Sequence, residues 1–134
     1  MSAAKKKTAA RIVWFEIPAD DLKRAQKFYG ALFGWKIAPF PGFTGPEAQN
    51  YLHINTGGPD ASPDGGLMKR MLPRQPITNY VSVPSVTRFM AKVKKLGGKV
   101  LVSRTAVPHM GYFAVCQDTE GNVFALWERN EQAK

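Results

Sequence analysis

The chain has 134 residues and a formal net charge of +9, with 44% hydrophobic, 11% aromatic and 22% charged residues. This length is typical of one domain, and this balance excludes a disordered or fibrous chain. No run approaches the roughly 18 consecutive apolar residues that a spanning helix needs, and no apolar segment follows the N-terminal lysines as it would in a secretory signal. We therefore expect a cytoplasmic protein without a membrane partner.

The positive charge is concentrated at the start of the chain. Lys5, Lys6, Lys7 and Arg11 all lie in the first eleven residues, which contain no acid. The other bases are interspersed with acids or lie along helix faces, as is typical of a solvated surface. We expect residues 1–10 to form a disordered basic tail, and we expect no specific nucleic-acid partner. The single cysteine, Cys116, excludes an intramolecular disulfide and is expected to be a small buried hydrophobe.

An internal repeat organises the rest of the chain. Residues 11–37 align without a gap with residues 75–101, an offset of 64 residues. Each copy opens with a strand-like run, at 12–17 and at 79–83, and continues into a helical pattern. Three further strand candidates then follow in each half, at 35–38, 50–55 and 66–71 in the first and at 99–102, 112–117 and 123–128 in the second.

The helix ends carry clear signals. Asp20 or Asp21 is placed to cap the first helix, which Gly34 ends. Ser85 is placed to cap the second, which Gly97 ends. These elements predict an α+β domain over residues 11–134, built from two βαβββ repeats, repeat one at 11–71 and repeat two at 75–130. Two such units predict a curved, partly open mixed sheet around a cup, with the helices outside.

Two motifs carry a family likeness. Phe28-Tyr29 stands four residues before Phe33-Gly34, with Trp35 next, and the stretch 111–128 reads GYFAVCQDTEGNVFALWE. These features resemble the vicinal oxygen chelate superfamily, which includes glyoxalase I, extradiol dioxygenases, fosfomycin-modifying enzymes and bleomycin-resistance proteins. The likeness extends over nearly all of residues 11–127. It supports the doubled fold and implies a homodimer, since members of the family commonly pair two chains.

The resemblance also implies a metal site whose ligands are replaced here. The family's enzymes hold one divalent metal with a His or similar residue from the first strand of each unit and a Glu or similar residue from the last. In this chain those positions fall on Trp14, Gly66, Thr78 and Ala125. Trp, Gly and Ala side chains offer no donor and Thr offers a weak one. We therefore expect a member depleted of metal ligands, with no metal and no cofactor.

Other residues remain as site candidates, each with a structural alternative. Glu16 lies two residues after Trp14 and so on the same strand face, where it either enters the cup or pairs with a surface base. His53 is a candidate acid or base near neutral pH, or an ordinary strand histidine. Strand alternation gives aromatic residues equivalent inward positions, either as a ligand-stacking wall or as core. The predicted ligand-binding set is Trp14, Glu16, Met68, Thr78, Tyr80 and Trp127.

Three functions follow from this pattern. The first is a metal-independent glyoxalase-like or bleomycin-resistance-like protein that binds a small, partly aromatic or apolar molecule in the cup. The second is a lyase- or isomerase-type enzyme of the same superfamily that uses Glu16 or His53. The third is a non-catalytic structural or regulatory module whose cup is filled by its own side chains.

Overall fold

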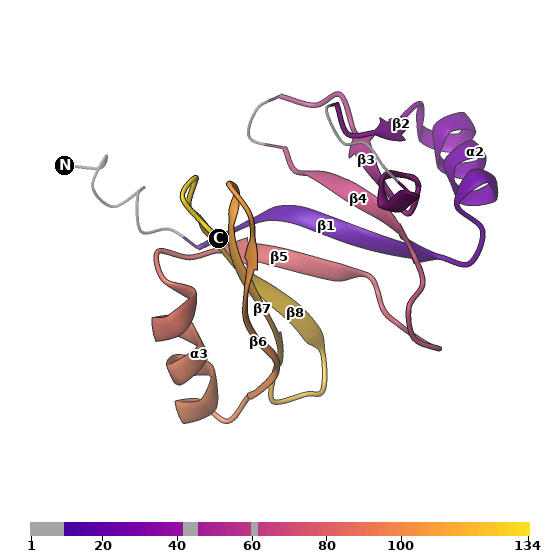
Figure 1. Cartoon of the computed structure of the whole chain (residues 1–134). Helices are drawn as coiled ribbons and strands as arrows, with labels where there is room; N and C mark the ends of the chain where they lie inside the picture. The colour runs from indigo at the N-terminus through magenta and orange to yellow at the C-terminus, as the bar shows by residue number, and fades with distance from the viewer. Residues whose placement is uncertain (1–9, 42–45, 60–61) are drawn as a thin grey trace. The chain divides into compact units, whose positions relative to one another are not determined.

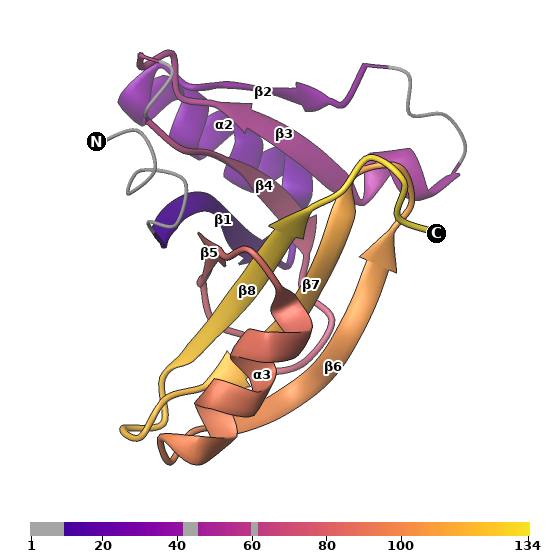
Figure 2. The same cartoon turned by 90° about the vertical axis from the view of Figure 1, so that its left-hand side faces the viewer.

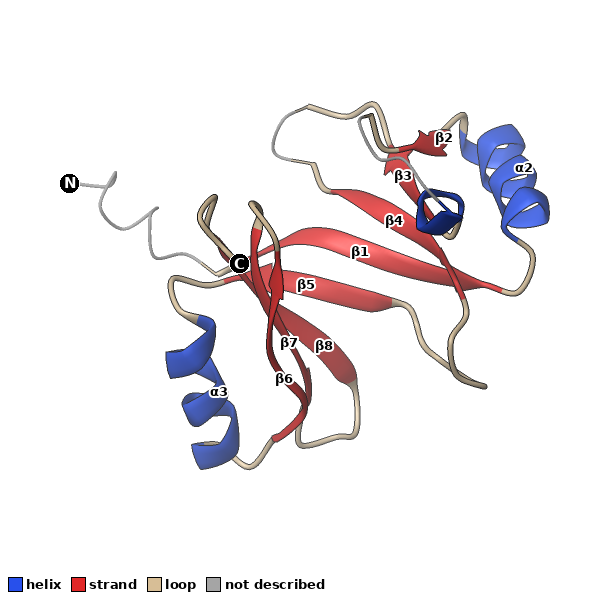
Figure 3. Ribbon diagram, in the orientation of Figure 1, coloured by secondary structure: helices blue, strands red, loops and turns tan. Residues whose placement is uncertain are grey.

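The computed structural model describes residues 10–41, 46–59 and 62–134, so the predicted basic tail lies almost entirely outside the described residues. The chain divides into two compact units. The first unit contains Trp14–Thr78, and the second contains Asn79–Lys134 together with residues 10–13. Within the described residues, each unit is a four-stranded sheet with one α-helix, and the first unit also has a short 3-10 helix (Figure 3). The predicted α+β class and doubled βαβββ pattern are confirmed.

The first unit has the strand order β2-β3-β4-β1 (Figure 1). Strand β4 pairs in parallel with β1, whereas the pairs β2–β3 and β3–β4 are antiparallel. Its elements in chain order are β1 (Arg11–Ala19), which belongs to this unit from Trp14 onward, α2 (Leu22–Phe33), β2 (Lys36–Pro39), η1 (Pro46–Gln49), β3 (Tyr51–Asn55) and β4 (Asp64–Lys69).

Helix α2 begins and ends where the sequence signals lie. The Asp21 side chain accepts a hydrogen bond from the backbone N–H of Arg24 at 3.0 Å, which satisfies one of the free donors of the first turn. Gly34 ends the helix with a left-handed φ of 72°. Of the two predicted caps, the structure selects Asp21, while Asp20 instead forms an ion pair with Arg70.

The second unit has the strand order β5-β8-β7-β6, and its helix lies along one face of the β6–β8 strands (Figure 2). Strands β5 and β8 are parallel, whereas β8–β7 and β7–β6 are antiparallel. Its elements are β5 (Thr78–Ser82), which belongs to this unit from Asn79 onward, α3 (Val86–Lys95), β6 (Lys99–Val107), β7 (Gly111–Gln117) and β8 (Val123–Arg129).

Helix α3 is anchored twice at its start. The Ser85 hydroxyl accepts from the N–H of Arg88 at 3.2 Å, as the sequence predicts. The N–H of Val86 donates to Oε1 of Glu128 on β8 at 2.9 Å, and a carboxylate at this end of a helix is also favoured by the helix dipole. The helix is thereby tied to the last strand of its own unit.

Each sheet packs one face against its helix. In the first unit, Ile17, Ile37, Leu52, Ile54 and Leu67 form this core. In the second unit it is formed by Val83, Val86, Ala114, Cys116 and Leu126. Cys116 is fully buried, as predicted, and burial raises the pKa of its thiol.

Every predicted strand differs from the observed one at one or both ends, mostly by one or two residues, and β4 and β6 show the reason. Strand β4 begins at Asp64 rather than at Gly66, because its parallel pairing with β1 extends to Trp14 opposite Asp64. Strand β6 continues to Val107 rather than ending at Val102, because its ladder with β7 resumes after two irregularities. Among the described residues, no helix is long and apolar enough to cross a membrane.

Candidate functional site

The first unit's sheet has one polar and aromatic face, which we call the open face. Alternate residues of each strand point toward α2, as Phe15, Ile17 and Leu52 do. The intervening residues lie on the opposite side. Pairing register places the following residues together on the open face: Trp14, Glu16, Tyr51, His53, Asp64, Gly66 and Met68.

Tyr51 links two of the predicted site residues. Its hydroxyl donates to Oε2 of Glu16 at 2.7 Å and accepts from Nε1–H of Trp14 at 2.9 Å. A hydrogen bond to a carboxylate is stronger than one between neutral groups. The two hydrogen bonds therefore hold the side chains of Trp14, Tyr51 and Glu16 together.

The ring of Tyr51 also occupies the space beside Gly66. A Cβ at Gly66 would overlap the Oη, Cζ and Cε1 atoms of Tyr51. Gly66 lies directly opposite Glu16 on β4. The position on β4 to which the family resemblance assigns a metal ligand is therefore covered by a tyrosine of the same sheet.

His53 is oriented by an acid that the sequence analysis did not single out. Its Nε2 lies 3.2 Å from Oδ2 of Asp64, and both side chains are about one-third exposed or less, at 28% and 35%. The other oxygen of Asp64 accepts from the N–H of Thr56 at 3.0 Å and from its hydroxyl at 3.1 Å. Asp64 is thus held in place, and it holds His53.

The His53 ring forms a layer with the rings of Trp14 and Phe40. The Trp14 and His53 rings are almost parallel, with an interplanar angle of 4° and centroids 5.9 Å apart. The Phe40 ring stacks on His53 at 5.0 Å and lies 6.0 Å from Trp14. All three side chains are partly exposed. This aromatic layer is an apolar surface with acid and imidazole groups at its edge, which suits a planar or apolar ligand.

The corresponding face of the second unit is different. Tyr80 lies opposite Ala125, and Trp127 lies opposite Phe113, so these residues share the side of their sheet that faces away from α3. Tyr80 and Ala125 are buried, and Trp127 packs over Gly111, where a Cβ would meet its ring. Tyr80 is therefore part of the buried core, whereas Trp127 and Phe113 are half-buried.

The polar atoms of the two remaining predicted site residues, Thr78 and Met68, already have hydrogen-bond partners within the protein. Thr78 begins β5 and is buried, with its hydroxyl 3.4 Å from the carbonyl oxygen of Pro76. Met68 lies opposite Tyr51 and its sulfur accepts from Nε2 of Gln75 at 3.7 Å. Both residues are held by neighbours in the chain segment that leads out of the first unit.

The residues present do not fit the divalent metal of the family's enzymes. Within residues 10–41, 46–59 and 62–134, no three His, Cys, Asp or Glu side chains converge on one point. Three of the four family positions hold Trp14, Gly66 and Ala125, which offer no donor.

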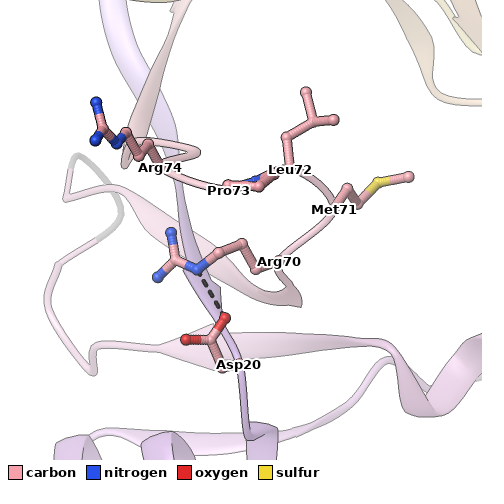
Figure 4. Close-up of a pocket in the computed structure, with 6 residues that line it drawn as sticks. All are labelled: Asp20, Arg70, Met71, Leu72, Pro73 and Arg74. Carbon is pink, nitrogen blue, oxygen red and sulfur yellow. Dashed lines mark hydrogen bonds and ion pairs between the residues drawn. The ribbon is translucent and has the colours of Figure 1, made fainter.

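An open pocket of about 620 Å³ lies elsewhere in the first unit, after β4 (Figure 4). It is lined by Asp20, Arg70, Met71, Leu72, Pro73 and Arg74. Figure 4 shows Arg70 turned toward Asp20, and its guanidinium also donates to the carbonyl oxygen of Gln75 at 2.7 Å. This arginine therefore stabilises the loop, and it engages the carboxylate of Asp20, which lines the pocket.

Sequence reasoning missed Phe40, Tyr51 and Asp64. Tyr51 was within reach of the sequence, because it alternates with His53 in YLHIN and so shares its face. Asp64 was not, because only the parallel register of β4 against β1 brings it opposite Trp14.

Comparisons with known proteins agree with this architecture. The family model of the bleomycin resistance protein-like N-terminal region matches residues 11–47. A "Glyoxylase-like domain-containing protein" of Didymella fabae is 34% identical over 122 residues, which cover 89% of this chain and 94% of that protein. The "Putative glyoxylase CFP32" of Mycobacterium bovis is 29% identical over 120 residues; these cover 87% of this chain but 45% of that longer protein.

A solved structure shows the same fold at low identity. A glyoxalase/bleomycin resistance protein/dioxygenase superfamily member from Vibrio splendidus superposes with a TM-score of 0.63 at 13% identity, covering 90% of this chain and 99% of that one. The sequence match along nearly the full length of the Didymella protein and the two βαβββ units lead to one assignment. The chain belongs to the glyoxalase/bleomycin resistance/dioxygenase superfamily.

Proposed function

We propose that this protein binds a small, partly aromatic or apolar molecule on the open face of its first unit, without a metal. The observation that carries the proposal is the partly exposed layer of Trp14, Phe40 and His53. A flat apolar ligand gains both burial and ring stacking on such a layer, each worth roughly 1 kcal/mol or more per ring. Glu16 and Asp64 supply the polar groups that orient it.

Tryptophan fluorescence during a fragment screen tests this proposal, because Trp14 lies in the aromatic layer and Trp35 does not. Trp35 packs against Phe15 and Tyr29 on the side of α2. We expect aromatic fragments to change the emission of the wild type and of Trp35→Phe, and to leave Trp14→Phe largely unchanged. Absence of any hit, or a response that persists in Trp14→Phe, would refute binding at this face and favour a self-filled structural module.

A second candidate function is supported by the His53–Asp64 pair. An acid that holds one ring nitrogen of a histidine fixes the ring orientation and directs its other nitrogen away, which is the arrangement of a general base. The glyoxylase-type name of the Didymella relative is consistent with a lyase or isomerase that uses this histidine or Glu16. Proton transfer to or from a bound substrate would be the reaction class.

An assay with methylglyoxal and glutathione, together with metal analysis of the purified protein, separates the two candidates. Binding without catalysis predicts no turnover and no stoichiometric metal. Turnover that is lost in His53→Ala and retained in His109→Ala would establish the enzyme instead. His109 is a suitable control because it lies in the second unit, outside the open face.

A further inference from the structure

Helix α2 leaves an apolar row on its outer side. Phe28 and Leu32, one turn apart, are each 58% exposed, and no residue of the helix is fully buried. On the side of α2 that faces the sheet, other rings make the contacts. There Tyr29 stacks on Trp35 with ring centroids 5.7 Å apart. Adjacent large apolar side chains exposed on one element commonly mark an interaction surface.

Bases border this row, and no acid does so within the helix. Arg24 precedes Phe28 and Leu32 at the same four-residue spacing, and Lys23 and Lys27 form the neighbouring row. All three bases are exposed, and Lys36 is exposed just beyond the helix. The nearest acid on the sequence, Asp21, has its carboxylate engaged as the helix cap. We call Lys23, Arg24, Lys27, Phe28 and Leu32 the α2 face.

We propose that the α2 face docks on an anionic phospholipid surface. An interfacial helix places Phe and Leu among the acyl-chain ends and Lys and Arg at the level of the headgroups, which is the distribution found here. Binding of such a helix scales with its buried apolar area and with its electrostatic attraction to anionic lipids, and the α2 face offers both. The expectation of no membrane partner rested on the absence of a spanning segment and did not consider this face.

Charge favours this occupant over two others. A second copy of the α2 face would bring like charges together, which costs free energy at an interface. A nucleic acid would satisfy the bases, but protein–nucleic acid interfaces are mainly polar and would leave the row of Phe28 and Leu32 without a partner. An anionic bilayer satisfies both the bases and the apolar row.

Co-sedimentation of the full chain with vesicles provides the test. We expect binding to vesicles of phosphatidylcholine with about 30% phosphatidylserine and little binding to phosphatidylcholine alone, with affinity falling as salt is raised. At about 1 kcal/mol per base near the surface, Lys23→Glu/Lys27→Glu should weaken binding at least tenfold. Phe28→Ser/Leu32→Ser should also weaken it about tenfold, because the apolar contribution is lost.

A matched pair of substitutions on α3 controls for electrostatic attraction between the whole positively charged protein and the vesicles. Lys94→Glu/Lys95→Glu changes the formal charge by the same amount on a helix that also lacks acids, and both residues are exposed. We expect it to weaken binding much less than the α2 pair. Equal weakening by both pairs, or unchanged binding in Phe28→Ser/Leu32→Ser, would show nonspecific attraction and overturn the proposal.

Light scattering tests whether a second copy of the protein covers the α2 face instead. A wild-type dimer that becomes a monomer in Phe28→Ser/Leu32→Ser would assign the face to a second copy and would likewise overturn the proposal. Circular dichroism of each variant checks that the fold is kept, which is expected because every substituted side chain is exposed.

Discussion

The two units share a topology, but their helix-distant faces are built differently. In the first unit this face carries Glu16, His53 and Asp64 beside partly exposed rings. In the second unit the equivalent face contains Tyr80 and Ala125, which are buried. On this face, the first unit therefore has polar side chains beside half-buried rings, whereas the second has buried residues at Tyr80 and Ala125.

The largest effect should come from restoring a carboxylate in the second unit. Ala125 is fully buried and pairs with Tyr80 and Val115. In Ala125→Glu an unpaired acid would enter this packing, so we expect a loss of about 4 kcal/mol in unfolding free energy. Urea denaturation measures it, with Ala125→Ser as the small polar control. A well-folded Ala125→Glu protein of near wild-type stability would mean that this face is as open as that of the first unit.

The next largest effects concern one glycine from each unit, Gly111 and Gly66, where an added side chain tests how tightly each is packed. A Cβ at Gly111 would overlap the backbone oxygen of Glu128, which cannot move without breaking the β7–β8 ladder. A Cβ at Gly66 would meet only the far end of the Tyr51 side chain. We expect Gly111→Ala to cost about 3 kcal/mol and Gly66→Ala about 1.5 kcal/mol. Thermal and urea unfolding compare the two.

The Gly66 effect should depend on its neighbour. In a Tyr51→Ala background the space beside Gly66 is free. In that background, Gly66→Ala should leave the free energy of unfolding almost unchanged. A double-mutant cycle measures this coupling. Additive effects of the two substitutions would contradict the account of Tyr51 as the group that covers the Gly66 position.

A smaller effect is expected from the hydroxyl of Tyr51 alone. Tyr51→Phe removes the bonds to Glu16 and to Trp14 but keeps the ring. We expect a loss of about 1.5 kcal/mol, because one of the two bonds involves a carboxylate. Denaturant titration with fluorescence detection reports both the stability and the surroundings of Trp14. Unchanged stability would imply that the hydroxyl is freely replaced by water.

The smallest effect concerns the β7–β8 turn of the second unit. The backbone N–H of Asn122 lowers the pKa of Asp118, and further bonds come from the N–H of Glu120 and the side chain of Asn122. A lowered pKa in the folded state stabilises the protein above the unfolded pKa, and this is lost as pH falls below about 4. The carboxylate is fully exposed, so the effect is small.

Comparing urea midpoints of the wild type and Asp118→Asn between pH 6 and pH 2.5 tests this sign. The wild type should be the more stable at pH 6, and the difference should shrink toward acid. A difference that grows as pH falls would show that the turn does not depend on the ionised form.

Much of the fold was predictable because its signals are local. Helix α2 is bounded by Asp21 and Gly34, which act through a side-chain cap and a left-handed φ. Helix α3 likewise starts at Ser85. The boundaries of β4 and β6 were wrong because a strand extends as far as its partner allows, and the partner is distant in sequence.

For the site, the resemblance to the family assigned the metal-ligand positions to residues of this sequence, and the side-chain chemistry of Trp14, Gly66 and Ala125 determined that they offer no donor. The sequence by itself also placed Trp14 and Glu16 on one face through the two-residue period of a strand. Only the tertiary structure decided what fills the vacated position. The ring of Tyr51 covers Gly66, and Asp64 reaches His53, because β1, β3 and β4 become neighbours through non-local pairing that no local pattern specifies.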